Sequence, residues 1–263
     1  MSSENSSSEK LNWVEKQFRM KELGTNVKKE TLAGITTFVS MAYILFVNPS
    51  VLGASGMDKG AVFTATALSA ILGCLLMAFL ANYPIAIAPG LGDNAFFTYS
   101  VVLAMGIKWQ TAIAGVVVAS FIFTILTFFK IREIVINAIP HNLKLAMAAG
   151  IGMFIAFIGL QGGGLVVASK SSLVQLGSLT VPTTWLTIFG LFVTALLMAR
   201  KVPGSIFIGI VATAILGLVT GLIKAPSQIV SSIPSMKPTF AVGIKHLGDV
   251  NTPQMWAVVL IFL

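Results

Sequence analysis

The sequence predicts an all-α, multi-pass membrane protein. Of its 263 residues, 56% are hydrophobic and only 10% are charged, and the mean hydropathy is +0.92. A soluble domain of this size needs far more polar surface. Apolar stretches recur at the length of about 20 residues that a helix needs to cross a bilayer. The basic residues stand singly or in pairs between these stretches, as in membrane loops, so a nucleic-acid partner is not predicted.

Residues 1–30 are polar and rich in serine, and we expect them to form a cytoplasmic tail before a membrane domain over 31–263. The tail contains no short apolar core followed by a cleavage site, so we do not expect a removable signal peptide. Cys74 is the single cysteine and lies in an apolar stretch, which excludes a disulfide framework and a cysteine metal site.

Six apolar stretches predict six membrane helices, and a seventh crossing is predicted over 84–105. The six helices are expected near 31–52, 61–82, 112–129, 143–160, 184–199 and 204–223. An eighth span begins near Pro253 and is still strongly apolar at Leu263. We therefore expect the chain to be the front part of a larger protein.

The crossing over 84–105 differs from the others because it contains helix breakers and a charge. Pro84 and Pro89 cannot donate backbone hydrogen bonds, and Gly90 and Gly92 admit strained backbone. Asp93 is the only acidic residue inside a long apolar stretch, where an ionisable group costs about 2.5–3.5 kcal/mol on insertion scales. We expect a short extended piece followed by a half-helix, lining a polar cavity and carrying the function.

Loop charge predicts the orientation of the chain. With a cytoplasmic N-terminus and 84–105 counted as a crossing, most basic residues face the cytoplasm, as the positive-inside rule requires. Those placed inside are Lys10, Lys16, Arg19, Lys21, Lys28, Lys29, Lys130, Arg132, Lys144, Arg200 and Lys201. Those placed outside are Lys59, Lys108, Lys170, Lys224, Lys237 and Lys245. Omitting the crossing would move Lys130 and every later loop to the opposite side.

Asp93 and Asn94 allow three interpretations. Either side chain could cap the half-helix, which we expect over 95–105, since Asp and Asn are favoured N-caps. The half-helix could instead present its free N–H groups and its positive dipole end to a substrate, with Asp93 and Asn94 facing the ligand. Asp93 could also exchange a proton that is coupled to transport. Capping and substrate binding are compatible with each other.

Thr36, Ser40 and Tyr43 share one face of the first predicted helix, because they are spaced by four and three residues. Such a polar stripe can line a substrate cavity. Hydrogen bonds between helices explain it equally well.

The sequence contains no catalytic constellation. His141 and His246 are its only histidines, and neither belongs to an H-E-x-x-H pattern. No G-x-S-x-G motif and no pair of carboxylates within a span is present. We therefore predict no enzyme activity, no metal site and no cofactor.

Three segments resemble the xanthine/uracil/vitamin C permease family, in its AzgA-like hypoxanthine/guanine/adenine branch. They are 36–49 (TTFVSMAYILFVNP), 87–97 (IAPGLGDNAFF) and 148–161 (AAGIGMFIAFIGLQ). The resemblance covers essentially everything after residue 10. It implies fourteen spans in two inverted seven-span repeats, of which this chain holds the first. It also implies a core domain with spans 31–130 and a gate domain with spans 143–223, followed by the start of the eighth span at 253–263.

The resemblance also implies where a purine binds. In the family the third and tenth spans are each a short strand plus a half-helix, and the purine sits between their tips. Asn94 matches the substrate-contacting residue of that motif, while Gly90 and Gly92 would keep the backbone close to the ligand. An apolar residue commonly holds the position of Asp93 in this branch, so Asp93 is a departure from the pattern. The family's acidic substrate and proton residues would lie beyond Leu263.

We therefore expect a proton-coupled importer of purine nucleobases in the cytoplasmic membrane that works by alternating access. Phe96 or Phe97 would supply aromatic contact with the purine. The rival hypothesis is an anion transporter, or a channel-like pathway, on the same fold, because a half-helix N-terminus also suits sulfate or a carboxylate. Asp93 argues against this rival, since its charge repels anions. Nothing in the sequence decides between a monomer and a homodimer.

Overall fold

The computed structural model describes residues 13–169, 172–224 and 232–263. Within these residues, five helices are long and apolar enough to cross a membrane, namely Val27–Gly53, Lys59–Ala81, Trp109–Phe128, His141–Gly162 and Pro182–Ala199. Two shorter apolar helices are α10 (Ser205–Val219) and α12 (Pro253–Phe262). Helices thus occupy all six predicted stretches and the predicted start of the eighth. Lys10 and Lys170, which entered the prediction of orientation, lie outside the described residues.

The first two membrane helices each change geometry along their length. The first consists of α2 (Val27–Met41) and α3 (Ile44–Gly53), with a break at Ala42 and Tyr43. Pro49 lies inside α3, and the carbonyl that its ring crowds is that of Leu45, which is already within α3, so Pro49 does not account for the break at Ala42 and Tyr43. The second consists of α4 (Lys59–Leu76) and a π-helical end, η1 (Met77–Ala81).

The third crossing has the predicted half-helix, but with a different boundary, and the short strand that the family resemblance implies before it is not assigned in the described residues. After a stretch without regular secondary structure over 82–90, a helix begins at Leu91 as α5 (Leu91–Ala95) and continues as the π-helix η2 (Phe96–Ala104). The expected start at Ala95 is therefore wrong by one helical turn. Gly90 is the N-cap residue. It follows Pro89, and the residue before a proline is disfavoured in helical conformation, so the helix does not extend toward the N-terminus past this point.

The prediction of an all-α protein is wrong in one segment. Between α8 (His141–Gly162) and α9 (Pro182–Ala199), strands β1 (Val166–Ser169) and β2 (Leu173–Leu176) form an antiparallel hairpin, with Val166 opposite Leu176. Four-residue strands give too short an alternation to stand out between long apolar stretches. Four further short helices were also not predicted: α1 (Trp13–Gln17), α7 (Ile131–Ala138), α11 (Val242–Lys245) and the 3₁₀-helix η3 (Leu247–Asn251).

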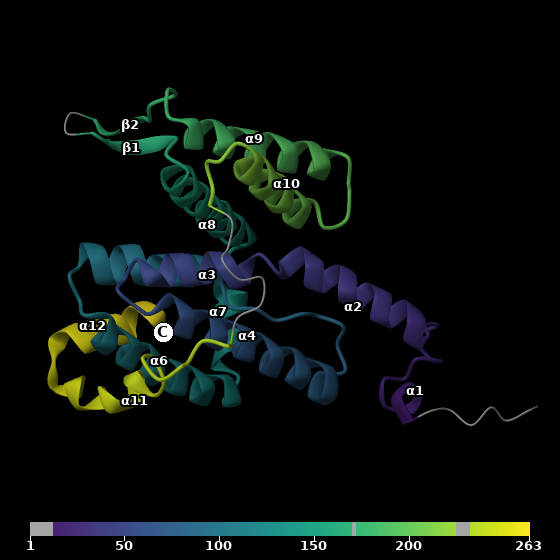
Figure 1. Cartoon of the computed structure of the whole chain (residues 1–263). Coiled ribbons are helices and arrows are strands. Elements are labelled where there is room, and N and C mark those ends of the chain that lie inside the picture. Colours follow the sequence, from purple (N-terminus) through teal and green to yellow (C-terminus); the bar gives the residue numbers. More distant parts are fainter. Residues whose placement is uncertain (1–12, 170–171, 225–231) are drawn as a thin grey trace, which may run out of the picture.

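The described helices pack as two groups, seen on either side of α3 in Figure 1. In the first group α4, η2, α6 (Trp109–Phe128) and α12 enclose the main hydrophobic cluster. The cluster comprises Met57, Val62, Phe97, Val101, Ile107, Ala112 and Val258. In the second group α9 packs along α10, while α8 has no buried residue and touches the first group through α5. The assignment of spans to core and gate domains remains a prediction.

The chain returns from the second group to the first after α10. The Thr64 hydroxyl donates to the Pro234 carbonyl at 2.9 Å, and the Thr111 hydroxyl donates to the Asp249 carboxylate at 2.7 Å. These two hydrogen bonds attach the segment before α12 to α4 and α6. They place α12 against α6, where it closes one side of the site described below.

Gly115 allows α6 and α12 to approach closely. A Cβ atom at this position would lie 2.8 Å from Val258 Cγ1 and 2.9 Å from its Cβ, in the middle of the hydrophobic cluster. We expect Gly115→Ala to destabilise the complete protein by about 1–3 kcal/mol, the usual cost of overpacking. Thermal unfolding of the purified protein in detergent measures this loss.

Gly150→Ala is the matched control, since a Cβ atom on this α8 glycine would meet nothing within 4 Å. It should leave the melting temperature unchanged or raise it, because alanine favours helix over glycine. Equal melting temperatures for the two variants would contradict the close packing of α6 on α12.

Candidate functional site

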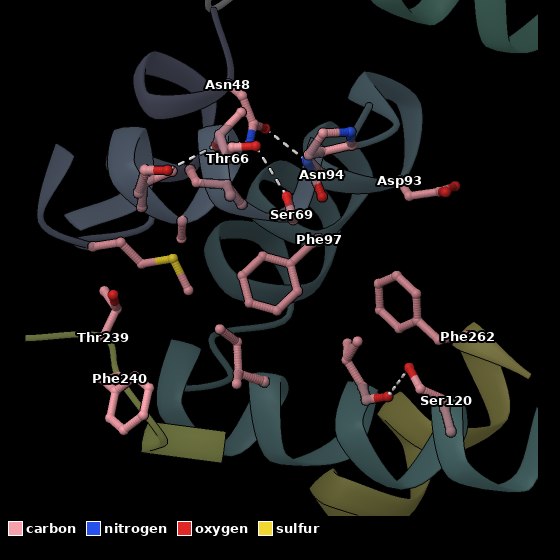
Figure 2. A pocket seen from close by; sticks show the side chains of 18 of the residues that line it. Asn48, Thr66, Ser69, Asp93, Asn94, Phe97, Ser120, Thr239, Phe240 and Phe262 are labelled. Atoms are coloured by element: carbon pink, nitrogen blue, oxygen red, sulfur yellow. Dashed lines mark hydrogen bonds between the residues drawn. The ribbon is translucent and has the colours of Figure 1, made fainter. Parts of the chain in front are cut away.

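A cavity of about 770 Å³ lies inside the first group of helices. Its walls come from α3, α4, α5, η2 and α6 and, later in the chain, from the segment 236–241 and α12. Most of its lining is apolar, with a few polar groups, most of which come from the wall formed by α3, α4 and α5, as in sites that bind small organic molecules. The residues that define it best are Asn48, Thr66, Asp93, Asn94, Phe97 and Phe262, all labelled in Figure 2.

A chain of three side chains joins three helices at the polar wall. Asn94 Nδ2, in the first turn of α5, donates to Asn48 Oδ1 on α3 at 2.6 Å. Asn48 Nδ2 donates to Thr66 Oγ1 on α4 at 2.8 Å, and the Thr66 hydroxyl donates to the Val62 carbonyl at 2.7 Å. Asn48 is only 2% exposed, so its amide depends on these protein partners. The chain fixes the tip of the half-helix against the first two membrane helices.

Asp93 lies on the same wall, and its side chain is exposed. The capping interpretation is wrong for both Asp93 and Asn94, because the N-cap residue is Gly90 and no side chain caps α5. Since the helix begins at Leu91, both residues are already inside its first turn. Their substrate-facing role, and proton exchange by Asp93, remain predictions.

The two glycines of the motif lie beside the cavity and not among its lining residues, although Pro89 does line it. A Cβ atom at Gly92 would lie 3.0 Å from Ile151 Cγ2, so Gly92 lets α5 approach α8. A Cβ atom at Gly90 would lie 3.2 Å from Asp93 Oδ2. Both glycines therefore have a packing role here, whatever their distance from a ligand.

Aromatic side chains from several segments line the cavity, and two of them, Phe97 and Phe262, pack against each other. Phe97 is 5% exposed and lines the cavity, and its ring centroid lies 6.4 Å from that of Phe262 on α12. Phe96 does not line the cavity, but its ring also packs on Phe262, at 6.1 Å. Of the two predicted aromatic residues, the structure thus brings Phe97 to the cavity (Figure 2).

The polar stripe of the first helix lies away from this cavity. The Thr36 hydroxyl donates to the Leu32 carbonyl, and the Ser40 hydroxyl donates to the Thr36 carbonyl, each at 2.9 Å. Tyr43 lies at the break between α2 and α3. The structure therefore does not bring these three residues to Asp93 and Asn94, and their role in binding remains a prediction.

Asn48, Thr66 and Phe262 were not predicted as site residues. Asn48 lies directly before Pro49 in the segment 36–49, and this position alone does not indicate a site residue. Thr66 is one of many threonines on membrane helices, and its sequence context contains no signal for a site. Phe262 lies far from Phe97 in the sequence, so no local pattern connects the two residues.

Cys74 holds the extended segment that leads into α5. The Ile87 N–H group donates to Cys74 Sγ at 3.3 Å, and the Cys74 thiol donates to the Ile87 carbonyl at 3.4 Å. A Cβ atom at the neighbouring Gly73 would lie 3.0 Å from Ile87 Cγ2, so this glycine allows the close approach. The Cys74 thiol thus gives a hydrogen-bond partner to both the N–H group and the carbonyl of Ile87, which pairs with no strand in the described part of the chain.

We expect Cys74→Ala to destabilise the protein by about 1–3 kcal/mol, because both polar groups of Ile87 lose their partner. Cys74→Ser is the matched control, since its hydroxyl can both donate and accept at the same position. Thermal unfolding of the two variants, side by side with the wild type, measures the difference. If serine and alanine give the same loss, the thiol does not support the extended segment.

Comparison with known proteins places this arrangement in context. The model of the permease family, Xan_ur_permease, matches residues 28–263. The chain is 51% identical over 255 residues to the guanine/hypoxanthine permease PbuG of Bacillus subtilis, covering 94% of this chain and 58% of that protein. It is 44% identical over 250 residues to the guanine/hypoxanthine permease PbuO of the same organism, covering 94% of this chain and 58% of PbuO. It is 40% identical over 223 residues to the adenine permease AdeP of Escherichia coli, covering 85% of this chain and 50% of AdeP.

Proposed function

This chain belongs to the permease family, and we propose that the complete protein imports purine nucleobases across the cell membrane as a secondary active transporter. The chain spans about 58% of the length of PbuG and PbuO, so activity and substrate are proposed for the complete protein. The names of the relatives support the substrate class, since they are permeases for guanine, hypoxanthine or adenine. Proton coupling and a cytoplasmic N-terminus are part of the proposal.

The observation that carries the proposal is the cavity, which is lined both by the polar groups around Asn94 and by the rings of Phe97 and Phe262. Its volume of about 770 Å³ lies within the usual range of about 300–1,000 Å³ for small-molecule sites. Asn94 would form hydrogen bonds with the purine edge, and Phe97 would contact the purine ring. Asp93 would add a negative charge beside the polar edge and would exchange the coupled proton.

The packing of the helices supports an alternating-access mechanism. The tip of the half-helix touches both groups, because Asn94 is bonded to Asn48 while Gly92 packs against Ile151 of α8. A sliding motion of one group against the other would carry this tip, and a ligand bound to it, across the interface. We assign the moving core to 31–130 and 253–263, and the gate to 143–223.

The anion transporter is the less favoured function. A sulfate or carboxylate ligand would meet the Asp93 carboxylate, and no lysine or arginine is among the residues that line the cavity in the described chain. An anion site normally supplies positive charge or several free N–H groups.

We expect the complete gene product to restore uptake of labelled hypoxanthine, guanine or adenine in a purine-uptake-deficient host. Asn94→Ala should reduce this uptake about tenfold or more, because the purine loses a hydrogen bond and the Asn48 carbonyl is left unpaired. Asn142→Ala, an exposed asparagine of α8, is the control and should transport normally. Absence of saturable uptake of all three bases by the wild type would overturn the proposed function.

We further expect Asp93→Asn to keep purine binding but to change the pH dependence of uptake. The amide has the same shape as the carboxylate and cannot exchange a proton. Initial uptake rates at several pH values, with and without a protonophore, measure the effect. Wild-type uptake that is indifferent to the protonophore, or an unchanged pH profile in Asp93→Asn, would remove Asp93 from proton coupling.

A further inference from the structure

We propose that Thr66 fixes the direction in which the Asn94 amide faces, so that its carbonyl oxygen, and not its N–H group, is presented to the ligand. Thr66 is then a positioning residue that sets specificity through Asn48 and Asn94. This inference deepens the function proposed above and rests on it. It requires the ligand to carry an N–H group where it meets Asn94.

The direction of all three hydrogen bonds follows from the last acceptor, the Val62 carbonyl. The main-chain carbonyl of Val62 can only accept, so the Thr66 hydroxyl, 2.7 Å away, gives it its single proton. The same hydroxyl oxygen can then only accept from Asn48, whose Nδ2 lies 2.8 Å away. The Asn48 carbonyl oxygen is therefore turned toward Asn94, and at 2.6 Å it accepts from Asn94 Nδ2.

The reversed direction makes fewer hydrogen bonds. Thr66 would then donate to the Asn48 carbonyl and Asn48 would donate to the Asn94 carbonyl, while the bond from Thr66 to Val62 would be lost. Water cannot replace the missing bond beside Asn48, which is 2% exposed. A difference of one hydrogen bond favours the observed direction about fivefold.

The carbonyl oxygen of Asn94 is left for a ligand. It has no hydrogen-bond partner among the described residues, and in Figure 2 it points away from Asn48 on the cavity side. The Asp93 carboxylate, on the same wall, is also an acceptor. The polar wall thus complements a ligand with ring or exocyclic N–H groups, such as hypoxanthine or guanine, and does not complement sulfate, which has none.

The first experiment compares two ligands on the complete protein. Dissociation constants are measured for hypoxanthine, whose six-membered ring carries an N–H group, and for unsubstituted purine, whose six-membered ring has only lone pairs. Thr66→Val removes the bond that distinguishes the two directions. The preference for hypoxanthine over purine, measured as the ratio of their dissociation constants, should therefore fall about fivefold. Thr66→Ser keeps the hydroxyl and should retain the wild-type ratio.

A matched control tests whether any lost threonine hydroxyl has this effect. The Thr127 hydroxyl makes the same kind of bond, to the Phe123 carbonyl at 2.8 Å, but Thr127 does not line the cavity. Thr127→Val should therefore leave the ratio unchanged. An unchanged ratio in Thr66→Val, with hypoxanthine still bound, would overturn the inference.

A second comparison does not depend on the folding of Thr66→Val. Asn94→Asp keeps an acceptor oxygen in the cavity, and Asn48 then has to turn to donate to the other carboxylate oxygen. This turn loses the bond from Thr66 to Val62 in the free and the bound variant alike, and the stronger bond to a charged acceptor offsets it. Hypoxanthine binding to Asn94→Asp should stay within about threefold of the wild type, whereas Asn94→Ala should lose about tenfold or more. If Asn94→Asp binds as poorly as Asn94→Ala, the ligand uses the N–H group of Asn94 and the inference is wrong. If the wild type binds no purine at all, the proposed function itself fails.

Discussion

One buried amide organises the site. Asn48 is the point at which α3, α4 and the half-helix are joined, because its oxygen accepts from Asn94 and its nitrogen donates to Thr66. A buried amide that loses one of these partners costs more than the bond itself, since neither water nor lipid can satisfy it. The position of the half-helix tip, and with it the polar wall of the cavity, therefore depends on this side chain. The apolar cluster below supplies packing, but it contains no group that could fix the direction of an amide.

The helices could be predicted because a bilayer imposes a length on them. A stretch such as 143–160, apolar except for Lys144 near its start, has to be helical to cross, and α8 differs from it by only two residues at each end. The hairpin of β1 and β2, and the short helix α7, lie between the long stretches and are not bound by that requirement. Local turns and packing determine their conformation, and these produce a weaker sequence pattern than the length requirement of a membrane helix.

The candidate site could be predicted only in part. Asp93 was noticed because a charge in an apolar stretch is costly, and Asn94 because of its motif, and both line the cavity. The predicted boundary of their helix is wrong because Asp and Asn are common N-caps, whereas the N-cap here is Gly90, which has no side chain to signal that position. Thr66 gave no signal at all, because a threonine that bonds its own helix looks the same in sequence whether or not a neighbour donates to it.

The pairing of Cys74 with Ile87 also makes the extended segment observable. Cys74 is the only cysteine in the sequence, and its thiol should be alkylated more slowly while it is engaged with the Ile87 backbone. The rate of its reaction with a maleimide therefore reports how often this segment separates from α4. Since the segment leads directly into the half-helix, Cys74 is a natural reactive group beside the site, and its modification follows the motion of this segment.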